Sequence, residues 1–156
     1  MGVEIERKFL INREKLDNHY EGERIAQGYF DPDAVPTTRV RIRGDKGYLT
    51  VKGRNEGISR PEFEYEIPLG DAEYMIEKFC SKTLVKDRFL IQHGEHTWEV
   101  DVFRGENEGL FIAELELQTE NETFIKPDWL GEEVSNDTRY YNSNLINLPY
   151  SKWKNT

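Results

Sequence analysis

The residues VEIERKFLI, near the start of the chain, place two acids and a base at alternate positions. Side chains alternate between the two faces of a strand, so Glu4, Glu6 and Lys8 would share one face. Carboxylates bind hard divalent cations through oxygen, and an ammonium group binds anionic oxygens. Such a strand is either the wet face of an antiparallel sheet or one wall of a site for a metal-bound anion.

Three other segments place only basic residues on one strand face. They are RVRIR with Arg39, Arg41 and Arg43, LTVKGR with Lys52 and Arg54, and LVKDRF with Lys86 and Arg88. Arginine binds phosphate through forked hydrogen bonds, and lysine contributes a point charge. Base-only strand faces therefore predict binding of an anion that carries many oxygens.

Three further segments place only acids on one face. They are EFEYEI with Glu62, Glu64 and Glu66, WEVDVF with Glu99 and Asp101, and AELEL with Glu114 and Glu116. Like charges two residues apart on a strand repel each other, and a chain selected only for solubility would mix the signs. Acid-only and base-only faces that turn toward one space predict a site for a metal-bound polyphosphate. Glu66 and Glu99 would either line that space or lie solvated at its mouths.

Eight segments with strand patterns carry these residues. They span residues 3–11, 24–31, 37–44, 47–54, 61–68, 84–93, 96–104 and 110–119. Glycine-containing turns in RGDKGYL, IQHGEHTW and RGENEGL predict antiparallel neighbours. Eight such strands predict a mainly β (α+β) fold, a closed eight-stranded antiparallel barrel with a few covering helices.

Helical patterns are weaker. Residues 12–20 and 71–80 are candidate helices, the second with Asp71 as N-cap and an apolar stripe. Asp137 is expected to cap a last helix, after a loop-like segment, KPDWLGEEVSND. Trp98, Trp129 and Trp153 could stack on a base, but two of the three lie in apolar or loop contexts, where packing against other residues is expected instead.

A closed barrel gives every strand one inward and one outward face. If the charges pointed outward, apolar residues would fill the barrel. If they point inward, the barrel is a polar tunnel, and helices or a partner must cover its apolar exterior. The sorting of charge by sign favours the tunnel, and an exterior left partly uncovered would favour a homodimer.

Length, charge and cysteine content limit the class of protein. The chain has 156 residues, which predicts one domain over 1–156, and its formal net charge of −9 disfavours a nucleic-acid partner held by phosphate contacts. We find neither a membrane-length apolar run nor a signal-peptide core, and we expect a cytoplasmic protein with no membrane partner. A single cysteine, Cys80, excludes an internal disulfide.

The order of these motifs resembles the CYTH superfamily, the triphosphate tunnel metalloenzymes. EIERKF resembles the signature that opens these proteins, and RVRIR, LTVKGR, EFEYEI, VKDRF, WEVDVF, AELEL and DTRYYN follow in order. The similarity covers nearly the whole chain and is greatest to the compact bacterial branch, which resembles tripolyphosphatases. The resemblance implies an eight-stranded tunnel, acids that bind Mg²⁺ or Mn²⁺, and bases that grip a linear triphosphate.

The resemblance also implies roles for individual residues. The acids that match metal-binding positions are Glu4, Glu6, Glu114 and Glu116, with Glu62, Glu64 and Asp101 at positions for a second metal or for water. The bases that match phosphate-binding positions are Lys8, Arg39, Arg41, Lys52, Lys86 and Arg88, with Arg43, Arg54 and Arg139 as further candidates. Among all of these, the expected catalytic residues are Glu4, Glu6, Lys8, Lys86, Glu114 and Glu116.

Hydrolysis of inorganic tripolyphosphate to phosphate and pyrophosphate is the expected activity, because phosphoryl transfer needs alignment and charge neutralisation more than covalent help. Within the same superfamily, a class IV adenylate cyclase or a thiamine or nucleoside triphosphatase is the alternative. Nothing in the sequence marks a pocket for an organic group. A non-enzymatic module that binds polyphosphate or divalent cations would carry the same acids and bases.

Overall fold

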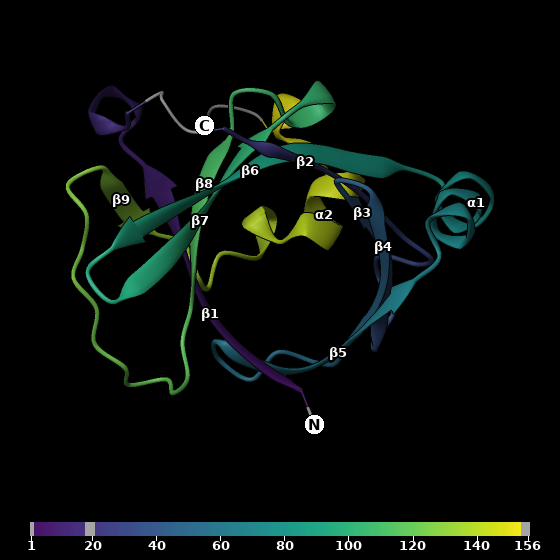
Figure 1. Ribbon diagram of the computed structural model, residues 1–156, viewed down its shortest axis with the longest axis horizontal. Helices are drawn as coiled ribbons and strands as arrows, with labels where there is room; N and C mark the ends of the chain where they lie inside the picture. Colours follow the sequence, from purple (N-terminus) through teal and green to yellow (C-terminus); the bar gives the residue numbers. More distant parts are fainter. Residues whose placement is uncertain (1, 18–20, 154–156) are drawn as a thin grey trace.

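The computed structural model describes residues 2–17 and 21–153. This part of the chain forms a ring of antiparallel strands, with one helix on the outside and another across one end (Figure 1). The barrel strands are β1 (Val3–Ile11), β2 (Glu23–Tyr29), β3 (Thr37–Arg43), β4 (Lys46–Lys52), β5 (Ser59–Ile67), β6 (Thr83–His93), β7 (His96–Phe103) and β8 (Phe111–Glu116). The other main elements are α1 (Leu69–Phe79), β9 (Leu130–Glu133) and α2 (Asn142–Asn147).

The ring closes through β1. The strand order is β5-β4-β3-β2-β6-β7-β8-β1, and β1 completes the circle by pairing Val3 with Pro61 and Ile5 with Ser59 of β5. Further along the same edge, β1 pairs with β9 at Phe9 and Ile11. The predicted eight-stranded antiparallel barrel is confirmed. The ninth strand was not predicted, because four residues of the sequence LGEE carry no alternating pattern.

The helices differ in detail from the expected ones. The helix α1 begins at Leu69, after Pro68, and no side chain caps it, so the prediction of Asp71 as N-cap is wrong. Pro68 itself occupies the N-cap position with an extended ψ of 139°, so the helix begins two residues before Asp71. Of the expected helix over 12–20, the structure has only a 3₁₀ turn, Arg13–Lys15, and residues 18–20 lie outside the described residues.

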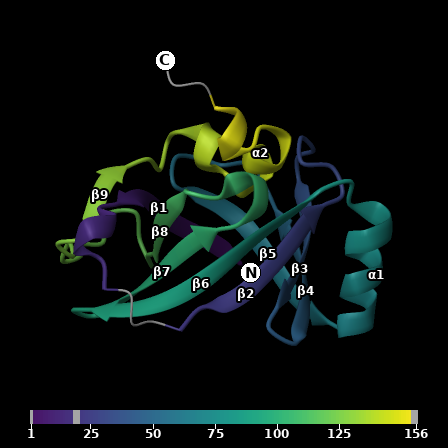
Figure 2. The same ribbon diagram turned by 90° about the horizontal axis from the view of Figure 1, so that it is seen from above.

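The last expected helix is split into two pieces. Asp137 accepts a hydrogen bond from the backbone N–H of Arg139, as predicted for a cap, but it caps a 3₁₀ turn over Thr138–Tyr140. The helix α2 then starts at Asn142, with Tyr141 as its N-cap. This break lets the chain turn across the end of the barrel between the two pieces (Figure 2).

The outside of the barrel is covered on two sides. The helix α1 lies against β3 and β4, where a Cβ added to Gly47 would come within 2.6 Å of the Cβ of Ala72. On β1, β7 and β8, the outward residues Phe9, Trp98 and Leu115 form a cluster with Trp129 from the loop that follows β8. Trp98 and Trp129 are thus the two tryptophans that pack in a buried cluster, as expected for two of the three. None of the helices in the described ranges combines the length and apolar character needed to cross a membrane.

The two ends of the barrel differ. At the end crossed by α2, which we call the α2 end, the inward residues Tyr29, Leu84, Phe103 and Ile112 pack with Leu145 of α2 in one buried cluster. Leu84 and Phe103 share the inward face of their strands with Lys86 and Asp101 respectively, by the two-residue period. The barrel interior therefore changes from charged to apolar along its axis.

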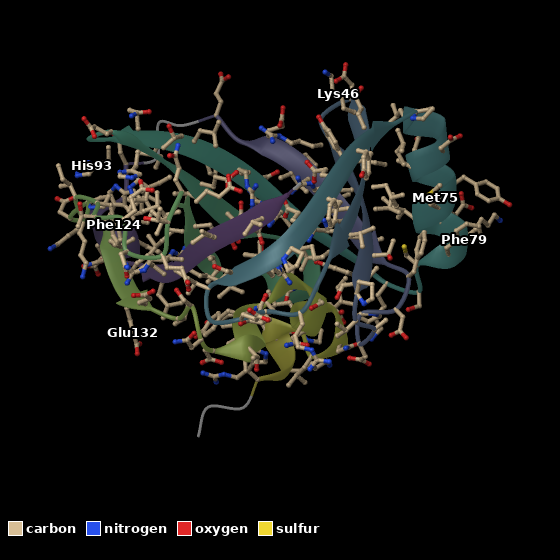
Figure 3. All side chains as sticks on the ribbon, turned by 90° about the horizontal axis from the view of Figure 1, so that it is seen from below. Lys46, Met75, Phe79, His93, Phe124 and Glu132 are labelled. Atoms are coloured by element: carbon tan, nitrogen blue, oxygen red, sulfur yellow. The ribbon has the colours of Figure 1, made fainter. Side chains whose placement is uncertain are left out.

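The opposite end carries the turns of the β3–β4 and β6–β7 hairpins, and we call it the hairpin end. Its turns contain Gly44 (φ 59°) and Gly94 (φ 64°), in a region that favours glycine. The side chains of Lys46 and Glu66 here are both 58% exposed, and Figure 3 shows Lys46 on the side of the molecule opposite α2. The side chains at this rim therefore face solvent.

Leu145→Ala tests the apolar filling of the α2 end. Leu145 is fully buried, so we expect the substitution to lower the free energy of unfolding by about 2–5 kcal/mol. Leu148, just after the same helix, is 52% exposed, and Leu148→Ala is expected to change it by less than about 0.5 kcal/mol. Urea unfolding followed by circular dichroism measures both. Equal losses for the two variants would contradict this account of the barrel end.

Candidate active site

A cavity of about 220 Å³ lies inside the barrel, lined by charged side chains from its strands. Most of the predicted site residues line it: Glu4, Glu6, Lys8, Arg39, Arg41, Arg43, Lys52, Glu62, Glu64, Lys86, Arg88, Glu114 and Glu116. They come from β1, β3, β4, β5, β6 and β8, so the charges do point inward. The other interpretation of the sequence, in which these charged residues lie on a solvent-facing outer surface of the sheet, is thereby excluded.

Three predicted residues do not line the cavity. Arg54 lies beyond the end of β4 and is exposed, because the strand stops at Lys52. Arg139 pairs with Asp137 at 2.6 Å on the surface. Asp101 is fully buried in the barrel wall and pairs with neighbouring cations.

One group of three acids lies near the start of β1. Glu4, Glu62 and Glu116 each offer a carboxylate oxygen within 4.8 Å of the others. Burial raises the pKa of Glu4, but the Lys52 ammonium, a hydrogen bond with Glu62 and the Arg60 guanidinium outweigh it and lower the pKa to about 2. Burial and the same hydrogen bond raise the pKa of Glu62. The hydrogen bond between the two carboxyl groups thus shifts their pKa values in opposite directions, favouring the ionised form of Glu4 and the protonated form of Glu62.

A second group of three acids is Glu6, Glu99 and Glu114, with carboxylate oxygens again within 4.8 Å of one another. Burial, with the carboxylates of Glu114 and Glu4, raises the pKa of Glu6 well above its usual value. The cations Lys8, Lys86 and Arg88 overcome burial and hold the pKa of Glu114 well below its usual value. Glu99, which was expected either to line the site or to be solvated, belongs to this group.

Lys86 and Arg88 form the most buried cationic part of the wall. The Lys86 ammonium lies 2.6 Å from Asp101 Oδ2, and the Arg88 guanidinium donates to both oxygens of Asp101 at 2.8 and 2.9 Å. Arg88 also donates to Glu99 at 2.8 Å. Asp101 thus holds two cations in place, since a bidentate carboxylate–arginine pair fixes orientation as well as charge. Burial outweighs the attraction of Asp101 and lowers the pKa of Lys86 to about 8.

Arg39 and Arg41 form a second cationic wall on β3. Their guanidinium groups lie 3.3 and 3.1 Å from Glu64 Oε2, which also accepts a hydrogen bond from Thr50. Within the described part of the chain, the Nε atoms of Arg39 and Arg41 are buried and have no hydrogen-bond partner. Burial and the neighbouring Arg39 lower the pKa of Arg41 to about 10. Two unused donors on adjacent arginines suit an anion with several oxygens.

The sequence of motifs has a match among protein families. The family model of the CYTH domain matches residues 2–145. The chain belongs to the CYTH domain family. It is 51% identical to the inorganic triphosphatase of Acetivibrio thermocellus over 99% of both chains, and 33% identical to the inorganic triphosphatase of Nitrosomonas europaea over 94% of this chain and 99% of that one.

Solved structures give the same family and fold. The crystal structure of an inorganic triphosphatase superposes on this CYTH chain with a TM-score of 0.66 and 30% identity, over 91% of this chain and 96% of that one. A putative adenylate cyclase from Bacillus halodurans is 18% identical with a TM-score of 0.60, over 77% and 84% of the two chains. At that level of identity, the second comparison shows the barrel fold only.

The CYTH barrel also places residues at the cavity that the sequence did not single out. Arg60 lies 3.2 Å from Glu4 and lines the cavity, so the inward face of β5 is not purely acidic. The two-residue period from Glu62 could have found it if β5 had been started at Ser59. The uncharged residues at the cavity are Tyr29, Thr37, Asn55, Gly57, Ile58, Ser135, Tyr141, Asn142 and Ser143. The residues from the C-terminal segment lie outside any strand pattern. The only sequence signal near them is the DTRYYN motif, which contains Tyr141 and Asn142.

Glu6→Gln tests the acid repulsion in the metal-free CYTH domain. Because the folded protein raises the pKa of Glu6, its protonated form is favoured, and stability is lost as pH rises through that pKa. A neutral glutamine keeps a hydrogen-bond donor for Glu114, so we expect the melting temperature in EDTA at pH 8 to rise by about 2–4 °C. The increase in melting temperature on adding Mn²⁺ should be smaller than in the parent. Glu66→Gln, at the exposed rim, is the control and should change neither value; a lower melting temperature for Glu6→Gln would contradict the repulsion.

Binding of tripolyphosphate in EDTA tests the low pKa of Lys86. The Lys86 ammonium is charged below its pKa of about 8 and neutral above it, so we expect affinity to fall as pH rises from 7 to 9. Loss of one charge-assisted contact corresponds to about tenfold in dissociation constant. Titration calorimetry measures the profile. Lys86→Met should abolish this fall in affinity with pH, and Lys46→Met, on the rim, should retain it. An unchanged pH profile in Lys86→Met would assign the fall in affinity to another group.

Proposed function

We propose that this protein hydrolyses inorganic tripolyphosphate to phosphate and pyrophosphate, with Mg²⁺ or Mn²⁺ as cofactor. One observation carries the proposal: the cavity inside the barrel has cations on part of its wall and two groups of three acids on the rest. Linear polyphosphate, with its chain of anionic oxygens, matches the cations of the wall, and a divalent cation matches the groups of acids. The names of the two curated relatives support the choice of substrate.

The basic residues would hold the phosphate chain. We expect the unpaired Nε donors of Arg39 and Arg41 to contact one phosphate group. We expect the buried Lys86 and Arg88, which also line the cavity, to contact another. Asp101 keeps Lys86 and Arg88 in position, and Glu64 does the same for the two arginines of β3. Preorganised charges of this kind stabilise a transition state without reorganising during the reaction.

The acids fit a divalent cation. Both groups offer only carboxylate oxygens, the donor type that Mg²⁺ and Mn²⁺ prefer, and both are partly buried among the bases. We place the metal ligands in these two groups, Glu4, Glu62 and Glu116 together with Glu6, Glu99 and Glu114. When bound, a divalent ion would orient phosphate oxygens and lower the pKa of a water molecule.

Water is the nucleophile in this proposal. Among the described residues, the cavity lining contains no cysteine and no histidine, so it offers neither a thiol nucleophile nor an imidazole base to activate Ser135 or Ser143. Water adds to a terminal phosphorus, the P–O bond to the neighbouring phosphate breaks, and the products are phosphate and pyrophosphate. In the metal-free protein, the cavity carboxyl groups with raised pKa values, which can hold a proton there, are Glu6, Glu62, Glu99 and Glu116.

The oligomeric state and location are proposed on weaker physical grounds. Val3, Phe63 and Tyr65 are exposed on the outer faces of β1 and β5, which α1 does not cover. We propose that this uncovered face supports a homodimer, and light scattering at micromolar concentration would decide between dimer and monomer. The net charge of −9 argues against a nucleic-acid partner. We place the protein in the cytoplasm, which imaging of a tagged chain would check.

A phosphate-release screen tests the function. Tripolyphosphate, ATP, thiamine triphosphate and pyrophosphate are each assayed with Mg²⁺, Mn²⁺ or Ca²⁺, and we expect the fastest release from tripolyphosphate. Glu116→Gln should lower that rate roughly 100-fold or more by removing a metal ligand, whereas Glu66→Gln at the rim should retain it. Faster turnover of ATP or thiamine triphosphate would favour the alternative enzymes. No release from any substrate, with tripolyphosphate still bound, would identify a binding module.

A further inference from the structure

The C-terminal segment Tyr140–Ser143 reaches the same cavity as the charged strands. It comes from the junction between the 3₁₀ turn and α2, at the α2 end of the barrel (Figure 2). Tyr141, Asn142 and Ser143 line the cavity with uncharged side chains, next to cations and acids from the strands. The proposed reaction assigns them no role.

Lys8 is held by this segment. Its Nζ donates to the backbone carbonyl of Tyr140 at 3.1 Å and lies 5.6 Å from the centre of the Tyr141 ring. Glu114 Oε1 lies 3.8 Å from the same ammonium, and the backbone N–H of Lys8 donates to Ser135 Oγ. A flexible lysine is therefore fixed from three directions, and an ammonium with three N–H bonds keeps donor capacity for a substrate oxygen.

The side chain of Asn142 has an unused hydrogen-bonding atom at the cavity. Its Oδ1 is buried and has no hydrogen-bond partner within the described ranges. Leaving a buried polar atom unpaired destabilises the folded protein, and such atoms are rare in proteins. Because the oxygen and nitrogen of an amide exchange places by a half-turn, Asn142 can accept from or donate to a group in the cavity. As placed, Oδ1 would accept from a water molecule bound to the phosphate chain; after the half-turn, the amide nitrogen would donate to a phosphate oxygen.

We propose that the segment Tyr140–Ser143 is part of the phosphate site: Tyr140 and Tyr141 position the Lys8 ammonium, and Asn142 contacts the phosphate chain directly. Tyr141 is a positioning residue, because it acts through Lys8. This proposal rests on the proposed function for the identity of its ligand. It also explains why the chain breaks between the 3₁₀ turn and α2, since a continuous helix would carry these residues on a different path.

The role of Tyr141 predicts a coupling to Lys8. Tyr141→Leu should raise the dissociation constant for tripolyphosphate in EDTA about fivefold, through loss of the ring that faces the ammonium. Tyr141→Phe keeps the ring and should restore most of the affinity. In a Lys8→Met background, Tyr141→Leu should have less than a twofold effect, because the group it positions is absent. Titration calorimetry measures all four proteins, and thermal unfolding confirms that each is folded.

The role of Asn142 is tested separately with a matched asparagine. Asn142→Ala should raise KM for tripolyphosphate about tenfold by removing a direct hydrogen bond to the charged ligand. Asn147, at the other end of α2, donates to Asp33 on the surface, and Asn147→Ala should leave KM unchanged. Equal effects of the two substitutions would mean that α2 contributes stability only and would overturn the role of Asn142.

The outcomes separate this inference from the proposed function. If the parent protein hydrolyses tripolyphosphate but Tyr141→Leu is additive with Lys8→Met, the positioning role is overturned and the function stands. If Tyr141→Leu fails to fold, the comparison of Asn142→Ala with Asn147→Ala decides the assignment of the segment. If the parent neither binds nor hydrolyses tripolyphosphate, both proposals fail together.

Discussion

The barrel depends on the compensation of charge in an enclosed space. An ion moved from water into a protein interior loses several kcal/mol of solvation, roughly, unless partners replace the water. Lys86 and Arg88 are buried because Asp101 lies between them, and Glu114 is ionised because cations surround it. At Glu6, burial and the carboxylates of Glu114 and Glu4 outweigh the attraction of Lys8 and Lys52, so its pKa is raised instead. The charges of the site thus compensate one another in large part. The acids and cations that are not compensated are suited to a metal ion and a polyanion, respectively.

Closing the sheet creates this space and also limits it. The same inward faces that carry charges around the cavity carry apolar residues at the α2 end, so one set of strands builds both a core and a site. The apolar cluster anchors α2 through Leu145, and α2 in turn brings Tyr141 and Asn142 to the cavity. Stability and function are therefore linked through the C-terminal segment, which lies far from β1 in sequence and next to it in space (Figure 1).

Much of the site could be predicted because strand geometry is local. Once a segment is a strand, a period of two residues assigns Glu4, Glu6 and Lys8 to one face whatever the rest of the chain does. The errors come from strand ends and from pairing. Arg60 was missed because β5 begins two residues earlier than its pattern, and Arg54 was included although β4 ends before it.

The sequence by itself determined which residues share a face, the sign of the charge on each face and, through the order of its motifs, the CYTH family. These follow from backbone periodicity and residue chemistry, which need no knowledge of distant contacts. Only the tertiary structure decided that the charged faces turn inward and that Asp101 pairs with cations while Glu99 joins the acids. It also brought Tyr141 to Lys8. Those outcomes depend on how the strands are staggered when the ring closes and on where the C-terminal segment packs, and both are set by contacts between residues far apart in the chain.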